Sequence, residues 1–194
     1  MSFLKVDEVY KSFGGLKAIN NVSFAMGKNI IKSIIGPNGA GKSTLFNLIS
    51  GHHKADRGKI IFKDSEIHKF SPYKIAYLGI SRTFQTIKLF PKMTVKENIM
   101  AARHTKSKAG LISSMFRLPS SNKEEKQIKE KAEYYLNLLG LEEFANIEAS
   151  NLPFGKQRLV EMARALATEP ELVLLDEPSS GLNIHETKEF GELI

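Results

Sequence analysis

Cysteine is absent from this sequence of 194 residues. Without thiols the chain can form neither a disulfide framework nor a cysteine-ligated zinc site, which fits a reducing compartment without proving it. Long apolar runs are also lacking, since no window approaches the ~18 apolar residues that a membrane-spanning helix needs. The N-terminus has charges at Lys5, Asp7 and Glu8 and no apolar central region, unlike a secretory signal. If this protein works at a membrane, another chain must hold it there.

Apolar and basic residues are both plentiful. A hydrophobic content of 42% can supply a core for one large domain, or for a domain with a subdomain. The 28 Lys and Arg exceed the 21 Asp and Glu by 7. This surplus is compatible with nucleic acid, a membrane surface or a phosphate ligand, and equally with a generally basic surface.

The first third of the chain predicts an α/β arrangement. Residues 3–9 and 19–25 predict paired strands, and the β-branched run at 30–35, bounded by Gly36-Pro37, predicts a buried strand. A helix is expected from Gly41 to Gly51. Further strands are expected at 59–62 and near 76–80.

The middle of the chain is helical in pattern. Thr94 and Glu97 form a capping box that opens a helix over about 95–104, and Ser121 and Glu124 form a second one. A loop-rich stretch with short helices is expected over 105–121. One face of an amphipathic helix is then made by apolar residues at helical spacing, which Gly140 ends: Ile128, Ala132, Tyr135, Leu136 and Leu139. We take 94–164 as a helical subdomain.

The chain then returns to an α/β pattern. Leu159, Met162, Ala163 and Leu166 line a helix that stops before Pro170. The run "ELVLLDE" follows, and strands of this continuous apolar type belong to mostly parallel sheets covered by helices.

A glycine-rich segment matches G-x-x-x-x-G-K-[ST] between a predicted strand and a predicted helix, the context that this phosphate-binding motif requires. Glycines let main-chain N–H groups turn toward an anion, and the following helix directs its positive end at the same point. A lysine can reach the β- and γ-phosphates, and a hydroxyl can bind Mg²⁺. The expected nucleotide-binding residues are Gly36, Pro37, Asn38, Gly39, Ala40, Gly41, Lys42, Ser43 and Thr44, with Ser43 at the metal.

Two carboxylates end the later apolar strand. Asp176 is placed to hold Mg²⁺ through its waters, and Glu177 to orient and deprotonate a water that attacks the γ-phosphate. Alone this pattern is equally compatible with a strand followed by a turn. Together with the glycine loop it predicts a nucleotidase, with Lys42 and Glu177 as catalytic residues.

Three further segments, "SRTFQ" around Gln85, "NLPFGKQRLVEMARAL" before the acidic strand and "SSGLN" after it, complete an ordered set. In this order the motifs resemble the ATP-binding subunit of ABC transporters over nearly the whole chain. The phrases "RTFQ", "LFPKMTVKENI" and "LPFGKQRLVEMARAL" most resemble the subfamily that powers import of branched-chain amino acids. A small-molecule kinase is formally compatible with the glycine loop alone, but it has no use for "LPFGKQR".

The resemblance implies a P-loop NTPase (RecA-like) α/β fold, with a mostly parallel sheet, an N-terminal antiparallel β part and an inserted helical subdomain. Residues 1–93 and 165–194 would form the nucleotide-binding core and 94–164 the helical subdomain with the signature segment. ATP and Mg²⁺ would be the cofactors. In such proteins two copies face each other head to tail with two ATP molecules between them.

The resemblance also implies roles for single residues. Phe13 would stack on adenine, with Tyr10 as the rival and a core or turn aromatic as the bland alternative. Gln85 would contact Mg²⁺ or the attacking water and sense the γ-phosphate. Gly155 and the helix after it would present N–H groups to the other copy's γ-phosphate.

The sequence departs from the family pattern in its signature segment. Pro153 replaces the usual serine, and proline offers neither N–H nor hydroxyl, so at least one hydrogen bond to phosphate is lost. Phe154 takes the next position, and Lys156 replaces a glutamine and could offset the loss with charge. Asn183 stands where many relatives have aspartate.

Relatives also carry a γ-phosphate-contacting histidine on a later strand, which this chain does not reach; His185 is too close to Glu177 to take that role. We therefore expect a C-terminally truncated chain whose sheet lacks a central strand, and this puts the activity of the chain in question.

The resulting expectation is an ATP-hydrolysing subunit of an importer for branched-chain amino acids. It would pair with a second ATP-binding subunit, identical or not, and dock on membrane permease subunits through its helical subdomain. It would serve a solute-binding protein indirectly, would bind no nucleic acid, and would lie at the cytoplasmic face of the cell membrane. The alternatives are a soluble ABC-type ATPase that acts on DNA or the ribosome, which +7 would suit, and an inactive nucleotide-binding remnant.

Overall fold

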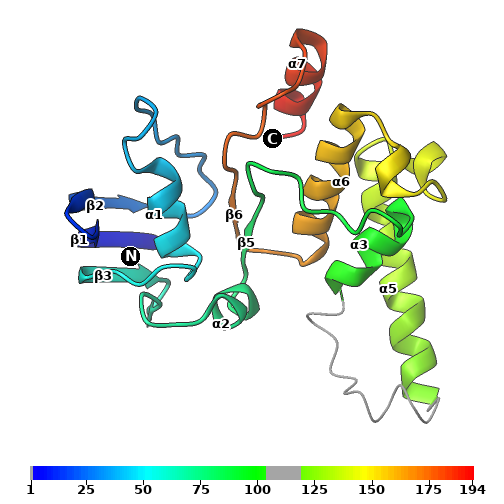
Figure 1. Cartoon of the computed structure of the whole chain (residues 1–194). Helices are drawn as coiled ribbons and strands as arrows, with labels where there is room; N and C mark the ends of the chain where they lie inside the picture. The colour runs from blue at the N-terminus through cyan, green and yellow to red at the C-terminus, as the bar shows by residue number, and fades with distance from the viewer. Residues whose placement is uncertain (1, 104–118) are drawn as a thin grey trace. The chain divides into compact units, whose positions relative to one another are not determined.

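The computed structural model describes residues 2–103 and 119–194 and divides into two compact units, Met1–Leu78 and Gly79–Ile194. Figure 1 draws both along the chain, and each is described by itself below. The expected division into a core (1–93 and 165–194) and a helical subdomain (94–164) stays a prediction.

The first unit is built on an antiparallel sheet in the order β2-β1-β3-β4. Its strands are β1 (Leu4–Phe13), β2 (Leu16–Met26), β3 (Arg57–Phe62) and β4 (Ser65–Glu66). Gly14 and Gly15 connect β1 to β2, and Gly14 has a φ of 57°, as a two-residue hairpin turn demands. The predicted strands at 3–9, 19–25 and 59–62 are confirmed.

Two helices accompany this sheet, α1 (Lys42–Ile49) and α2 (Pro72–Tyr77). The apolar side of α1 is buried, and so are the inward-facing side chains of the sheet. Burying several such side chains, at roughly 1.5–3 kcal/mol each, is what holds a unit of this size together. The core of this unit contains Leu4, Val6, Val9, Ile19, Leu45, Leu48, Ile49, Ile60, Phe62, Ile67 and Ile75.

The buried strand predicted at 30–35 is not formed. Among the described residues none pairs with this segment, and Ile31 and Ile35 are 77% and 92% exposed. A β-strand is defined by hydrogen bonds to a neighbour, so an apolar run without a neighbour stays irregular. The short strand expected near 76–80 is formed but begins later than predicted, because α2 continues to Tyr77 and the strand starts at Ile80.

The second unit begins with two short parallel strands, β5 (Ile80–Arg82) and β6 (Leu172–Leu174). The ladder extends by one bond, because the Thr83 amide donates to the Leu174 carbonyl at 3.0 Å. This pair places the residues after Arg82 and after Leu174 at the same end of two adjacent strands.

Helices make up the rest of this unit: α3 (Val95–Arg103), α5 (Pro119–Leu138), α6 (Phe154–Ala167) and α7 (Ile184–Glu192). Two 3₁₀ turns, η2 (Glu142–Phe144) and η3 (Ala149–Asn151), lie between α5 and α6. In Figure 1, α3, α5 and α6 lie side by side, and apolar residues from all three share one core.

The predicted amphipathic face is confirmed, because all five of its residues are buried, four of them in α5 and Leu139 directly after it. The capping box at Thr94 is also confirmed: the Thr94 amide donates to Glu97 Oε2 at 2.8 Å and the Glu97 amide to Thr94 Oγ1 at 3.2 Å. The box expected at Ser121 does not open a helix, since α5 already begins at Pro119, where proline suits a first helical turn. Most of the loop expected over 105–121 lies outside the described residues.

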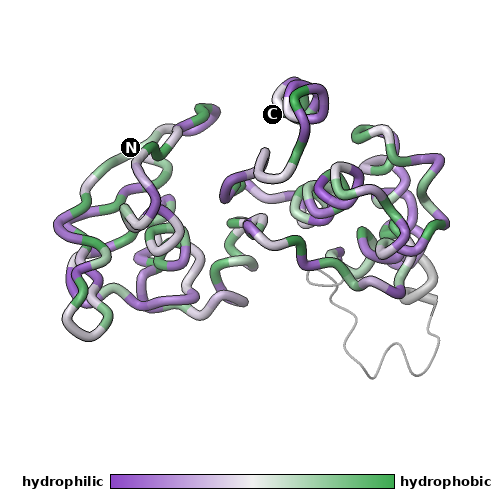
Figure 2. Tube along the Cα trace, turned by 45° about the horizontal axis from the view of Figure 1, so that its top comes forward, coloured by the Kyte–Doolittle hydropathy of each residue, from purple (hydrophilic) through white to green (hydrophobic). Residues whose placement is uncertain are grey.

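Hydrophilic and hydrophobic residues interleave along the described helices (Figure 2). Within residues 2–103 and 119–194, no helix combines the length and the apolar character needed to cross a membrane.

Candidate functional site

The glycine loop lies in the first unit, between the irregular segment after β2 and helix α1. Gly39 and Gly41 have φ values of 81° and 89°, and Gly41 is the N-cap of α1. A Cβ at Gly41 would stand 2.4 Å from the Ala18 carbonyl oxygen, so the close approach of these two main chains requires glycine. No side chain caps α1, and such an uncapped N-terminal turn suits an anion such as phosphate.

Lys42 folds back over this loop. Its Nζ donates to the carbonyls of Gly36 at 2.7 Å and Pro37 at 2.9 Å. The ammonium group therefore lies beside the loop, where a phosphate chain would meet it. The geometry of residues 36–44 fits a bound polyphosphate, and the role of each residue stays a prediction.

The two aromatic candidates for adenine stacking sit in different surroundings. Phe13 is 43% exposed, and its ring meets the His53 ring edge-on with centroids 5.1 Å apart. Tyr10 lines a hollow of about 350 Å³ together with Lys17 and Asp56. An exposed ring can stack on a base, so Phe13 keeps its predicted role and Tyr10 remains the rival.

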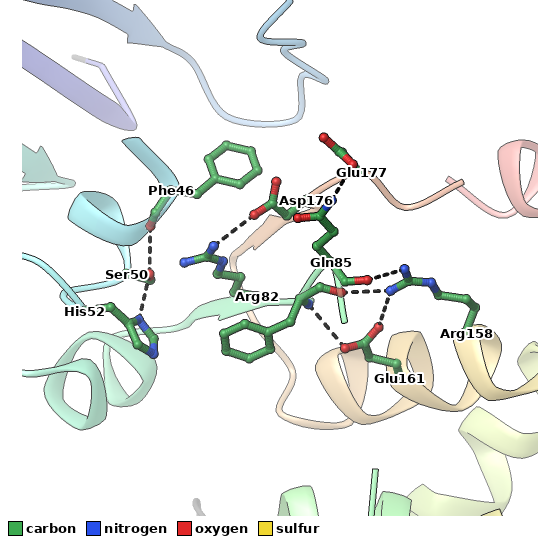
Figure 3. A network of polar contacts seen from close by, with 10 residues as sticks. Phe46, Ser50, His52, Arg82, Gln85, Arg158, Glu161, Asp176 and Glu177 are labelled. Carbon is green, nitrogen blue, oxygen red and sulfur yellow. Dashed lines mark hydrogen bonds and ion pairs between the residues drawn. The ribbon is translucent and has the colours of Figure 1, made fainter. Parts of the chain in front are cut away.

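The acidic pair lies in the second unit, directly after β6 (Figure 3). Asp176 is 6% exposed, and its Oδ2 accepts a hydrogen bond from Arg82 Nη2 at 2.9 Å. Arg82 ends β5, so the parallel register of the two strands brings this cation to the aspartate. Burying a carboxylate is costly unless it is paired, so the contact with Arg82 stabilises this buried side chain.

Glu177 and Gln85 contact each other at the same end of the strand pair. Glu177 is exposed and has a φ of 47°, and its Oε2 accepts a hydrogen bond from Gln85 Nε2 at 2.9 Å. The structure therefore brings Gln85 to Glu177, next to Asp176 in sequence, and the catalytic and metal-binding roles of these residues stay predictions. The glycine loop belongs to the other unit.

Oxygen donors dominate this cluster, which suits Mg²⁺, a cation that prefers oxygen ligands. The predicted ligands in this unit are Asp176, which would hold the ion through its waters, and Gln85. Arg82 competes for the Asp176 carboxylate, so the arginine must share this group with a metal. Ser43, the third predicted ligand, lies in the first unit.

The signature segment forms the first turn of α6. Pro153 is the N-cap, Phe154 is 47% exposed and Gly155 is buried. The side chain of Glu186, from α7, lies so close to Gly155 that an added Cβ would come within 2.3 Å of Glu186 Oε1. Lys156 lies over the Phe144 ring at 5.5 Å.

Asn183, where the family often has aspartate, is the N-cap of α7. Its Oδ1 accepts from the Glu186 amide at 2.9 Å, and Glu186 Oε2 accepts from the Asn183 amide at 2.9 Å. This reciprocal capping gives Asn183 a local structural use within the second unit.

The sequence did not predict a role for three charged residues near Gln85: Arg82, Arg158 and Glu161. All three are buried or nearly so, and Arg158 Nη1 lies 3.0 Å from Glu161 Oε2. The sequence did contain an indication of the Arg158–Glu161 ion pair, because two opposite charges three residues apart interrupt the apolar pattern of a predicted helix.

Comparison with known proteins identifies the family. Residues 19–180 match the family described as ABC transporter. The chain belongs to the ABC transporter family. This ABC transporter chain is 44% identical over 191 residues to the high-affinity branched-chain amino acid transport ATP-binding protein LivG of Escherichia coli (strain K12). The aligned region covers 98% of the chain and 75% of LivG.

Solved structures that resemble this chain are also ATP-binding cassettes. The chain resembles the crystal structure of the ADP conformation of an ATP-binding cassette of an ABC transporter, with a TM-score of 0.83 and 36% identity, over 100% of the chain and 75% of that cassette. It also resembles a dimeric cassette in a post-hydrolysis state bound to ADP and Pi, with a TM-score of 0.80 and 26% identity, over 98% of the chain and 80% of that cassette. The expected α/β cassette fold class and the family resemblance are confirmed. The mostly parallel sheet is not seen among the described residues, whose strands form one antiparallel sheet and one parallel pair, because the predicted buried strand at 30–35 is not formed.

Proposed function

We propose that the chain binds and hydrolyses ATP as the nucleotide-binding subunit of an ABC importer for branched-chain amino acids. The observation that carries this proposal is the glycine loop, with Lys42 folded over an uncapped helix start, in a chain 44% identical to LivG. LivG is named as the ATP-binding protein of high-affinity branched-chain amino acid transport.

In this proposal the residues divide the chemistry between them. The loop from Gly36 to Thr44 binds the phosphates, and Lys42 neutralises charge that develops on the γ-phosphate. Glu177 takes a proton from the attacking water, and Gln85, bonded to Glu177, holds that carboxylate in place. The predicted ligands of Mg²⁺ are Ser43, Gln85 and Asp176, and the ion would neutralise charge on the phosphate oxygens.

The partners are proposed from the family. A dimer is supported by the related dimeric cassette bound to ADP and Pi, and a membrane permease by the transport names of the relatives. The helical part of the second unit would dock on that permease, at the cytoplasmic face of the membrane. A separate binding protein would deliver the amino acid.

Two substitutions test this function. Lys42→Ala should weaken Mg-ATP binding by at least about tenfold, since it removes a charged donor to phosphate. Glu177→Gln should bind ATP normally but lower turnover by about a hundredfold or more, since an amide cannot accept the proton of the water. Binding is read from nucleotide-induced thermal stabilisation and turnover from phosphate release. Hydrolysis at the wild-type rate in Glu177→Gln would remove this glutamate from the mechanism.

A further inference from the structure

Helix α6 holds the main chain at Gln85 with two buried charges. Arg158 Nη1 donates to the Phe84 carbonyl at 2.8 Å, and its Nη2 donates to the Gln85 carbonyl. Glu161 Oε1 accepts from the Phe84 amide at 3.2 Å, while its Oε2 lies 3.0 Å from Arg158 Nη1. These contacts are drawn in Figure 3.

This arrangement fixes both hydrogen-bonding groups of Phe84 and the carbonyl of Gln85. Arg158 and Glu161 are 4% and 6% exposed, so water competes poorly for these bonds. One turn further along the same helix, Arg164 Nη1 donates to the Lys88 carbonyl. The helix therefore holds the segment from Phe84 to Lys88 at both ends.

The contacts continue from this segment to the acidic pair. With its main chain held by α6, Gln85 directs its side-chain amide to Glu177 Oε2 at 2.9 Å. A continuous series of hydrogen bonds thus joins the signature helix to the glutamate that faces the reaction. Such a series can set a side chain's position even though its first members touch no substrate.

We propose that Arg158 and Glu161 are positioning residues for Gln85, and through it for Glu177, so that the placement of the hydrolytic carboxylate depends on the signature helix. The kinetic part of this inference rests on the proposed ATPase function. The positional part concerns hydrogen bonds that exist without nucleotide and is measurable without activity.

The first experiment measures position. In Glu161→Gln and Arg158→Lys, hydrogen exchange at the Phe84 amide should accelerate, and the side-chain amide resonance of Gln85, assigned with Gln85→Ala, should shift. The matched control is Glu133→Gln, which breaks the exposed Lys96–Glu133 ion pair of 2.7 Å in the same unit without touching residues 84–88. Exchange in β1, in the other unit, should stay unchanged in every variant.

The second experiment is a double-substitution cycle in ATP turnover. Glu161→Gln should lower kcat by at least about tenfold with KM for ATP within about twofold, because misplacement affects the chemical step more than binding. In the Gln85→Ala background the same substitution should have less than about a twofold effect, since the residue to be positioned is gone. A purely structural role would reduce activity equally in both backgrounds and lower the thermal midpoint in parallel.

The possible outcomes distinguish the positioning role from the proposed ATPase function. If the wild-type chain binds Mg-ATP but Glu161→Gln acts equally with and without Gln85, the positioning role is overturned while the ATPase function stands. If the wild type neither binds nor hydrolyses ATP, the proposed function fails, and the exchange and resonance data decide the positional claim. Unchanged Phe84 exchange in both Glu161→Gln and Arg158→Lys overturns it. If Glu161→Gln does not fold, Arg158→Lys alone carries the same tests.

Discussion

Gly39 and Gly41 share a left-handed backbone but differ in what surrounds them. A Cβ at Gly41 would meet the Ala18 carbonyl oxygen at 2.4 Å and Ile19 Cδ1 at 2.9 Å, whereas nothing lies within 4 Å of the same atom at Gly39. The two positions therefore separate the cost of backbone conformation from the cost of a close approach. Within the predicted phosphate-binding loop, Gly39 is needed for its φ, and Gly41 for both its φ and its small size.

We expect Gly39→Ala to destabilise the nucleotide-free protein by about 1 kcal/mol, the ordinary cost of a left-handed alanine. Gly41→Ala should cost clearly more, by roughly 1–3 kcal/mol beyond this, because the main chain of Ala18 must move. Urea unfolding without nucleotide, followed by the fluorescence of the tyrosines, measures both. Equal midpoints for the two variants would show that the contact at Ala18 is not a constraint.

At the scale of the element, a helix or strand was predicted correctly where the interactions that form it lie close together in sequence. The buried face of α5 and the capping box at Thr94 follow from spacings within one helix, and both were predicted. The run at 30–35 has strand-forming residues but no strand partner among the described residues. Whether a strand finds a partner depends on distant parts of the chain, so the residues of the run alone could not predict it.

The candidate site divides in the same way. The glycine loop, Asp176 and Glu177 were recognisable because each motif is contiguous in sequence. Arg82 was missed because its contact to Asp176 spans 94 residues and arises from the parallel register of two strands. Arg158 and Glu161 were missed for a similar reason, since their partners at Phe84 and Gln85 lie more than 70 residues away.

Glu169, which follows the end of α6, forms ion pairs with residues of both α3 and α5. Its Oε1 lies 2.6 Å from Lys131 Nζ of α5, and its Oε2 lies 3.0 Å from Arg103 Nη1 of α3. The hydrogen bond from Lys131, followed by that from Arg103, holds the pKa of Glu169 below its ordinary value. A lowered pKa in the folded state means that this glutamate stabilises the fold above its unfolded pKa, and that the contribution is lost as pH falls through the folded pKa.

Glu169→Gln should therefore lower the thermal midpoint at pH 7, by roughly 1–3 °C because the group is partly exposed. The difference from the wild type should shrink as the pH falls below the unfolded pKa of about 4.3, and should be lost once the pH lies below the lowered pKa of the folded state. Glu130→Gln, which removes the exposed Lys126–Glu130 ion pair within α5, serves as the control and should change the midpoint little. A Glu169→Gln difference that stays constant from pH 7 to pH 3 would contradict the electrostatic origin.

At the scale of the whole molecule, the predicted phosphate-binding loop and the signature segment lie in different compact units of one chain. The signature glycine, Gly155, lies in the first turn of α6, where main-chain N–H groups point out of the helix. In the proposed dimer, each ATP is held by the loop of one copy and covered by the signature turn of the other. ATP itself is then part of the interface, so dimerisation should require bound, unhydrolysed nucleotide.

Glu177→Gln, which should retain ATP, is the variant in which this dimer should accumulate. With Mg-ATP its mass by light scattering should rise from that of the monomer to twice that value, whereas ADP should leave it monomeric. Adding Pro153→Asp, at the exposed N-cap of α6, should abolish the dimer while keeping nucleotide-induced thermal stabilisation, because a carboxylate at the signature turn repels the partner's γ-phosphate and leaves the residues of the glycine loop unchanged. Lys42→Ala should also remain monomeric, and in this case the thermal stabilisation should be lost as well. If Glu177→Gln binds Mg-ATP and still remains monomeric, nucleotide does not bridge two copies of this chain.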